Sequence, residues 1–375
     1  MKYFHIFKPI VLFCLVTILL NGCGDDGSDA KKSSPEVSEN ETGSISMENY
    51  TDSVFQVIKA HRTSYAKFII NRLVNEEKVI KASEHWKDEK GALLLPAQMF
   101  RETATILQDS GSDISFSLLS LVPINKQNAP KTDVEKKGLE YVNANPDKSF
   151  YGEEKLGPKT YFTAVYPDNA VSMACVSCHN NHKDSPKKDF KMDENMGGVV
   201  IRIPIDGGDA GQINMEKYAN SVSSVIKAHR TSYAKFIINR LVNEEKVIKA
   251  SEHWKDEKGA LLLPAQMFRE TATILQDSGS DISFSLLSLV PINKQNAPKT
   301  DVEKKGLEYV NANPDKSFYG EEKLGPKTYF TAVYPDNAVS MACVSCHNNH
   351  KDSPKKDFKM DENMGGVVIR IPKEV

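Results

Sequence analysis

The chain contains the same sequence twice. Residues Val57–Pro204 and Val225–Pro372 are identical at all 148 positions, with a constant offset of 168. Identity of this extent is more than a fold requires, since cores tolerate many sequences; it points to a recent duplication or to an error in assembling the source sequence. We therefore predict two tandem modules with one common fold, each long enough to bury its own core.

Each copy carries a Cys-x-x-Cys-His pentad, which is the attachment signature of a c-type haem. Two thioether bonds would join the cysteines to one edge of the porphyrin, and the histidine would supply the proximal ligand of the iron. The predicted cofactor is haem c, two per chain. The attachment residues are Cys175, Cys178, Cys343 and Cys346, and the proximal iron ligands are His179 and His347.

A Cys-x-x-Cys pair also occurs in thioredoxin-like redox sites and in zinc sites. A thioredoxin-type pair does not require the histidine that follows both pairs here. A zinc site needs further ligands, and each copy offers only three more histidines, which in the first copy are His61, His85 and His182. The two remaining cysteines, Cys14 and Cys23, belong to the N-terminal region, so none is left for a structural disulfide. These counts favour haem.

The N-terminus has the pattern of a bacterial lipoprotein signal. A short basic stretch precedes Pro9–Leu20, an uncharged run too short to span a bilayer. The next residues end in Gly22-Cys23 and are similar to a lipoprotein cleavage site, which makes residues 1–22 a signal peptide and Cys23 the lipidated residue. The alternatives are an ordinary cleaved signal and an uncleaved anchor. Gly24 favours an outer-membrane destination, so we expect the protein in the bacterial cell envelope, lipid-anchored and facing the periplasm.

Composition separates the modules from their connections. Residues 23–46 contain almost no bulky apolar side chain and are predicted to form a disordered tether. Residues 205–214 contain three glycines and are predicted to form a flexible linker. The modules are then residues 47–204 and 215–375. The net charge of −2 shows no basic excess that would indicate a nucleic-acid partner.

Within each module, the pattern predicts helices first and a sheet afterwards. An apolar stripe at helical spacing predicts a long first helix, and Pro96–Leu107 a second. Predicted strands are Ile114–Val122, Thr160–Tyr166 and Met196–Ile203, with a short helix at Asp133–Asn143. The stripe consists of Val54, Ile58, His61, Tyr65, Phe68, Ile69 and Leu73. This is an α+β plan.

The sequence around the haem motif resembles one family. Asp168–Asn180, Lys183–Phe190 and Met196–Val200, with Leu95–Arg101 and Asn128–Pro130 upstream, are similar to the Tll-type c-haem domains, long catalogued as a domain of unknown function. The resemblance implies PAS-like modules with long leading helices, a small antiparallel sheet and one c-type haem each. It also implies frequent use as an extracytoplasmic sensor ahead of kinases or cyclases. The best-described haem of that family takes a cysteine as its distal ligand, and this repeat has no spare cysteine.

The distal ligand is therefore open. His61 and His229 lie on the apolar stripe of the first helix, where an imidazole could reach iron; the alternative is a core histidine bonded to backbone. Met99 and Met267 are the second candidates, with ordinary core packing as their alternative. A water molecule or a vacant sixth position is a third alternative.

A basic loop follows the haem motif. It could dock an acidic redox partner or neutralise haem propionates, and the alternative is a solvated surface loop. Arg101 is a further candidate for a propionate contact. The basic residues of the loop are Lys183, Lys187, Lys188 and Lys191.

Two haem motifs favour a dihaem c-type cytochrome that acts in electron transfer with a redox partner protein. The alternative is a haem-based redox or gas sensor, which would need a partner such as a sensor kinase in trans because only three residues follow the second repeat. A dihaem peroxidase-like enzyme is less favoured. Such an enzyme uses one haem for the chemistry and the other to deliver electrons, and two identical copies could differ in this way only through their positions.

Overall fold

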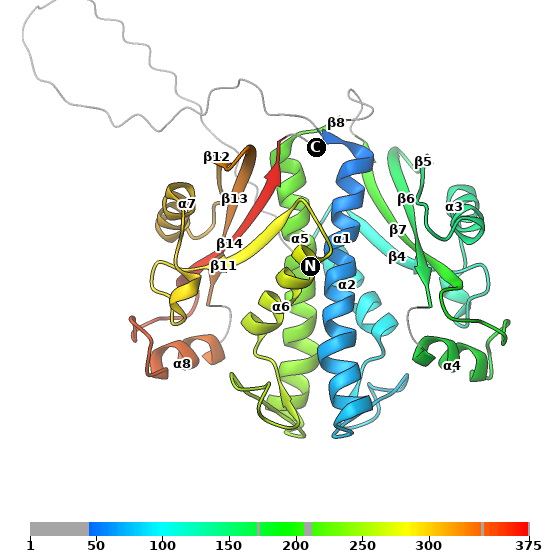
Figure 1. Ribbon diagram of the computed structural model, residues 1–375, viewed down its shortest axis with the longest axis horizontal. Coiled ribbons are helices and arrows are strands. Elements are labelled where there is room, and N and C mark those ends of the chain that lie inside the picture. The colour runs from blue at the N-terminus through cyan, green and yellow to red at the C-terminus, as the bar shows by residue number, and fades with distance from the viewer. Residues whose placement is uncertain (1–44, 171–172, 206–211, 339–340, 374–375) are drawn as a thin grey trace, which may run out of the picture. The chain divides into compact units, whose positions relative to one another are not determined.

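A computed structural model describes residues 45–170, 173–205, 212–338 and 341–373 (Figure 1). The predicted signal peptide, the lipidation residue Cys23 and most of the predicted tether lie outside these residues. The described residues fall within one compact unit, so the two modules can be described together.

Each module opens on a long helix. In the first, α1 (Met47–Tyr65) continues directly into the π-helical segment η1 (Ala66–Glu76). The Ser46 side chain caps α1 by accepting a hydrogen bond from the Asn49 N–H at 3.2 Å. The predicted apolar stripe is confirmed, because all seven of its residues are buried. The second module repeats the arrangement with α5 (Met215–Tyr233) and η3 (Ala234–Glu244).

The remaining elements follow the same order in both copies. In the first module they are β2 (Lys81–Ala82), β3 (Ala92–Leu93), α2 (Pro96–Asp109), β4 (Ser115–Leu119), η2 (Lys126–Asn128), α3 (Asp133–Ala144), β5 (Phe150–Leu156), β6 (Lys159–Asn169), α4 (Met173–Asn181) and β7 (Asn195–Ile205). In the second they are β9 (Lys249–Ala250), β10 (Ala260–Leu261), α6 (Pro264–Asp277), β11 (Ser283–Leu287), η4 (Lys294–Asn296), α7 (Asp301–Ala312), β12 (Phe318–Leu324), β13 (Lys327–Asn337), α8 (Met341–Asn349) and β14 (Asn363–Pro372).

Each module contains a four-stranded antiparallel sheet. The strand orders are β4-β7-β6-β5 and β11-β14-β13-β12. Successive residues of β6 point to opposite faces, so Val165 packs with Leu139 of α3, whereas Ala164 belongs to the core that contains α1. Gly138 lets α3 approach the sheet closely, since an added Cβ would lie 2.4 Å from a methyl group of Val165. The α+β prediction with two tandem modules is confirmed.

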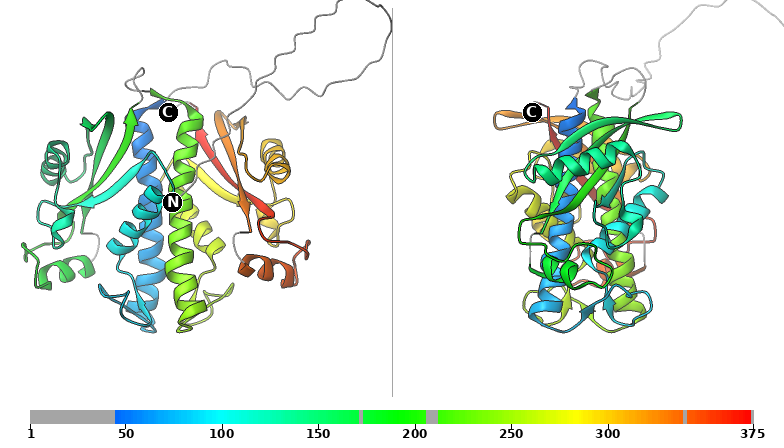
Figure 2. Two further views of the ribbon diagram at one scale, coloured as in Figure 1. Left: turned by 180° about the vertical axis from the view of Figure 1, so that it is seen from behind. Right: turned by 90° about the vertical axis from the view of Figure 1, so that its right-hand side faces the viewer.

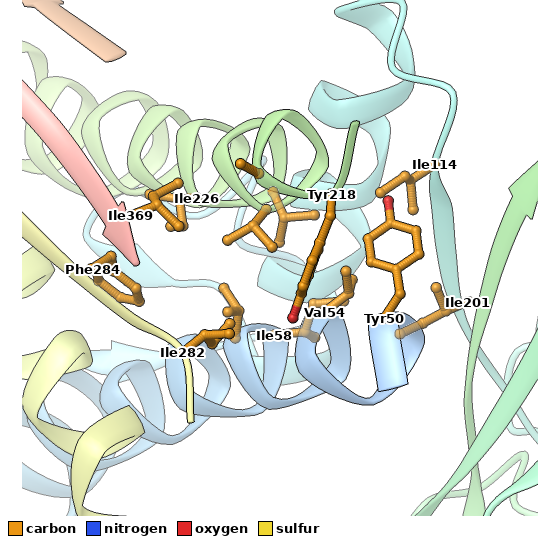
Figure 3. Close-up of a cluster of buried hydrophobic side chains, with 14 of the residues drawn as sticks. Tyr50, Val54, Ile58, Ile114, Ile201, Tyr218, Ile226, Ile282, Phe284 and Ile369 are labelled. Atoms are coloured by element: carbon orange, nitrogen blue, oxygen red, sulfur yellow. The ribbon is translucent and has the colours of Figure 1, made fainter. Parts of the chain in front are cut away.

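The two modules meet along their leading helices. Rings at equal positions of the repeat face each other: Tyr50 lies 4.9 Å from Tyr218, and His61 lies 4.1 Å from His229, between centroids. Because equal positions meet, α1 and α5 run side by side in the same direction (Figures 1 and 2). The largest buried cluster draws on both modules (Figure 3). The expectation of two separate cores therefore fails: each module keeps a small core under α3 or α7, but the main core is shared.

Three features differ from the sequence-based expectations. The end of the predicted tether forms β1 (Ile45–Ser46), which pairs antiparallel with β8 (Gln212–Ile213) at the end of the predicted linker. The edge strand β5 was not predicted. The haem motif, for which no element was predicted, is helical. Among the described residues, no helix is both long and apolar enough to cross a membrane.

Candidate functional site

The Cys-x-x-Cys-His motif lies on α4, which connects the two central strands of the sheet, β6 and β7, along the chain. Residues three and four apart share one face of a helix, so Cys175, Cys178 and His179 lie on the same side of α4. Cys178 is exposed and Cys175 is half-buried. Val176 is buried in a small apolar cluster and anchors the helix to the module. The second module presents Cys343, Cys346 and His347 on α8 in the same way.

The loop after α4 folds back onto the helix and supports the histidine. The Asn180 side chain donates to the Phe190 carbonyl at 3.0 Å, and the Phe190 N–H donates to the Asn180 side-chain oxygen at 2.9 Å. This pair of bonds holds the Phe190 ring edge-on to the His179 ring, with centroids 5.7 Å apart. The support is local, because every group in it lies within the segment from α4 to the end of the loop.

The environment keeps His179 neutral. Burial lowers the pKa of His179, and the negative charge of Asp168 opposes this effect only in part. Its Nδ1 atom is buried and has no hydrogen-bond partner in the described part of the chain. His347 repeats both features. A neutral imidazole with an unsatisfied nitrogen is suited to ligate a metal, so the residues present fit the proximal role.

The cysteines also fit covalent attachment. Burial, and after it the negative charge of Glu84, raise the pKa of the Cys178 thiol, so that the thiol is protonated at neutral pH. A protonated, exposed thiol can add across a vinyl group, with its hydrogen passing to the second vinyl carbon. The zinc alternative finds no further ligands, since the described residues contain no cluster of three or more His, Cys, Asp or Glu able to hold a metal ion.

His182 lies at the end of α4 and is engaged elsewhere. Its Nε2 is 3.2 Å from a carboxylate oxygen of Glu84, and its Nδ1 accepts a hydrogen bond from the Asp184 N–H at 3.1 Å. These contacts connect α4 to the loop after β2. His85, which stands in a charged stretch, is exposed.

The candidate distal ligands meet one another rather than the haem motif. His61, Met99, His229 and Met267 all line one cavity of about 40 Å³ between the modules. Among the described residues, none of the ring contacts of His61 reaches α4. His229 donates from Nδ1 to the Val225 carbonyl at 2.9 Å, which matches the alternative of a core histidine bonded to backbone. The distal assignment stays a prediction.

An ion pair that the sequence did not reveal connects the leading helix to the haem motif. Arg62 of α1 lies 2.9 Å from Asp168 at the end of β6, and Arg230 repeats the contact with Asp336 at 2.8 Å. Asp168 also influences the pKa of His179. Asp168 stands inside the block that resembles the family, but nothing in a single sequence identifies its partner.

The basic loop is partly neutralised by its own acids. Lys187 pairs with Asp189 at 2.6 Å and with Glu194 at 3.1 Å. The other lysines of the loop, and Arg101, are exposed. At Lys187, therefore, the loop fits the alternative of a solvated surface loop. Its other lysines remain accessible to a partner.

Comparison with known proteins gives one match. The sequence model of the Tll0287-like family matches residues 41–204 and residues 211–372, which together make up most of the chain and coincide with the two repeats. No curated protein and no solved structure matches the chain.

Proposed function

Because the chain belongs to the Tll0287-like family through both of its repeats, we propose that it is a dihaem c-type cytochrome that acts in electron transfer. The observation that carries this proposal is the geometry of α4: an exposed Cys178 stands beside a half-buried, neutral His179 on one helical face. A cofactor held there would have one edge near the surface, where a redox partner can approach.

Each residue of the site has a defined task in this proposal. A bound haem supplies one-electron chemistry at its iron. Cys175 and Cys178 hold the cofactor covalently, and His179 ligates the iron while Phe190 fixes the plane of its ring. The second module would use Cys343, Cys346 and His347 in the same way. We further propose PAS-like modules and a lipid on Cys23 that holds the protein at the periplasmic side of the outer membrane.

Optical spectroscopy tests the electron-transfer role. If the haems act only in electron transfer, the purified holoprotein should give a reduced-minus-oxidised difference spectrum of a c-type haem that carbon monoxide leaves unchanged, because electron transfer needs no open position for a gas. A strong carbon monoxide adduct on both haems would argue against simple electron transfer.

A haem-based sensor is the second candidate, and the Arg62–Asp168 ion pair favours it. The pair joins the end of β6 to α1, and α1 packs against α5 of the other module. A change at one haem could thus shift the packing of α1 against α5. Hydrogen exchange of α1 and α5, measured with and without nitric oxide, tests this role. Altered protection that disappears in Arg62→Met would support it, and identical protection in both states would exclude it.

A further inference from the structure

The cavity between the modules has an unusual lining. It measures about 40 Å³, which is room for a water molecule or a single ion and far too little for a porphyrin. Both modules contribute to it, and among its lining residues Arg230 alone carries a formal charge, which the ion pair with Asp336 neutralises. Two imidazole and two thioether side chains line it: those of His61, His229, Met99 and Met267.

Two ring nitrogens in this cavity lack partners. His61 is 8% exposed and His229 is 9% exposed. The Nδ1 atom of His61 and the Nε2 atom of His229 are buried, with no hydrogen-bond partner among the described residues. A buried polar atom without a hydrogen bond raises the free energy of the folded state, so a ligand that binds both nitrogens would stabilise the fold.

His229 makes the backbone hydrogen bond that metal-ligating histidines usually make. His229 donates its Nδ1–H to the Val225 carbonyl at 2.9 Å, which leaves the lone pair on Nε2. The two rings lie 4.1 Å apart between centroids, at an interplanar angle of 63°. Burial lowers the pKa of both histidines, that of His229 to about 4, so both are neutral near pH 7.

The hydroxyl groups around the pair are already engaged. Thr271 donates to Ser64 at 2.8 Å, and Ser64 donates to the His61 carbonyl at 2.9 Å. Ser232 is held in the same way, between Thr103 and the His229 carbonyl. These bonds fix the helix backbone beside both rings and leave the ring nitrogens for another partner.

Two methionines complete the lining. Met99 is 7% exposed and Met267 is 8% exposed. Two neutral imidazoles and two thioethers, with no carboxylate in the lining, form a donor set that prefers a soft cation such as Cu(I) over Mg²⁺, Ca²⁺ or Mn²⁺. We propose that His61, His229, Met99 and Met267 form a Cu(I) site at the module interface. The site goes beyond the proposed cytochrome function and exists only where two modules pair.

A competition titration tests the site. The holoprotein, kept reduced with ascorbate, is titrated with Cu(I) against a chromophoric Cu(I) chelator. We expect one equivalent per chain to be held.

The double variant Met99→Leu/Met267→Leu nearly conserves volume, so it should fold and bind Cu(I) at least tenfold more weakly. His61→Gln/His229→Gln should abolish binding. His85→Gln/His253→Gln, at exposed histidines, is the matched control and should bind as the wild type does.

Two further measurements separate this proposal from the haem assignment. A variant with Cys175, Cys178, Cys343 and Cys346 all changed to Ala cannot attach haem, yet it should still hold one Cu(I). X-ray absorption of the copper-loaded protein should show nitrogen and sulfur ligands together. Unchanged Cu(I) affinity in both the methionine and the histidine variants would overturn the proposal. So would a shifted Soret band in the histidine variant, because the histidines would then be haem ligands.

Discussion

Arg72 of the first module lies over the indole ring of Trp254 of the second, 5.2 Å from the ring centroid, and Arg240 makes the same contact with Trp86. Each arginine also donates to a backbone carbonyl of the opposite module, Arg72 to that of Ala260. Within its own module, Arg72 pairs with Glu77 at 2.6 Å. The two copies are therefore interlocked at the end of the shared helical core formed by η1 and η3, rather than only joined by a linker.

Removing one of these indoles should destabilise both modules together. Trp254 is 6% exposed and packs edge-on against Phe68 of the other module at 5.5 Å. Trp254→Ala should lower the free energy of unfolding by about 3–5 kcal/mol, in a single transition. Tyr141→Ala, at an exposed position, is the control and should cost about 0.5 kcal/mol or less. Two separate transitions in urea, one of them at the wild-type midpoint, would show that the modules are independent.

The buried histidine pair should make the protein sensitive to acid. The folded-state pKa of His229, about 4, lies below its ordinary value of 6.5, so the unfolded chain binds the proton first. The free energy of unfolding should be highest above pH 6.5 and should fall as the pH drops toward 4. His229 alone would account for about 3 kcal/mol of that loss. Urea unfolding at pH 7.5 and pH 4.5 measures the effect. His229→Gln should reduce the pH dependence, and an equal dependence in the variant would contradict this account.

A buried charge network stabilises each sheet. Arg202 donates to Glu135 and to Glu154, both at 2.6 Å, and neither carboxylate is more than 8% exposed. Arg202→Met would leave two buried carboxylates without their cation and should cost about 3–5 kcal/mol, measured by denaturation. Arg370→Met should cost the same, because its network is identical. Lys187→Met, in an exposed ion pair, is the control and should leave the stability nearly unchanged. A small loss in both arginine variants would contradict this account.

Lipid anchoring should depend on one residue. Cys23 is the only cysteine outside the predicted signal peptide and the two haem motifs. Cys23→Ser should lose lipid labelling and membrane association together, as measured by metabolic labelling and fractionation. Membrane association that persists without lipid would identify Pro9–Leu20 as an uncleaved anchor.

The sequence predicted the elements whose pattern is strong. The stripe from Val54 to Leu73 indicated the leading helix because a burial period of 3.6 residues is readable in one chain. The edge strand β5 was missed because Phe150–Leu156 carries a glycine and three charged residues, a composition that an edge strand tolerates. The motif helix α4 was missed because two of its nine residues are cysteines required for chemistry rather than for helix formation.

What the sequence could not provide is the partner of each buried face. The stripe indicated that His61 is buried, and a haem was one reasonable neighbour for it. Its ring lies against that of His229, at the same position of the other copy, and no pattern within one repeat indicates this contact. The same limit applies to Arg62 and Asp168, since a pair so far apart in sequence is specified only by the fold.

The central claim, that each module attaches its own haem, is tested most directly by counting covalent haem per chain. Mass spectrometry of the denatured protein, with the pyridine haemochrome spectrum as a second count, should give two haems for the wild type. Because the cluster that supports α4 lies within the first module, Cys175→Ala/Cys178→Ala should give one haem, attached at Cys343 and Cys346. A wild-type chain without covalent haem, or a variant that has lost both haems, would contradict the account.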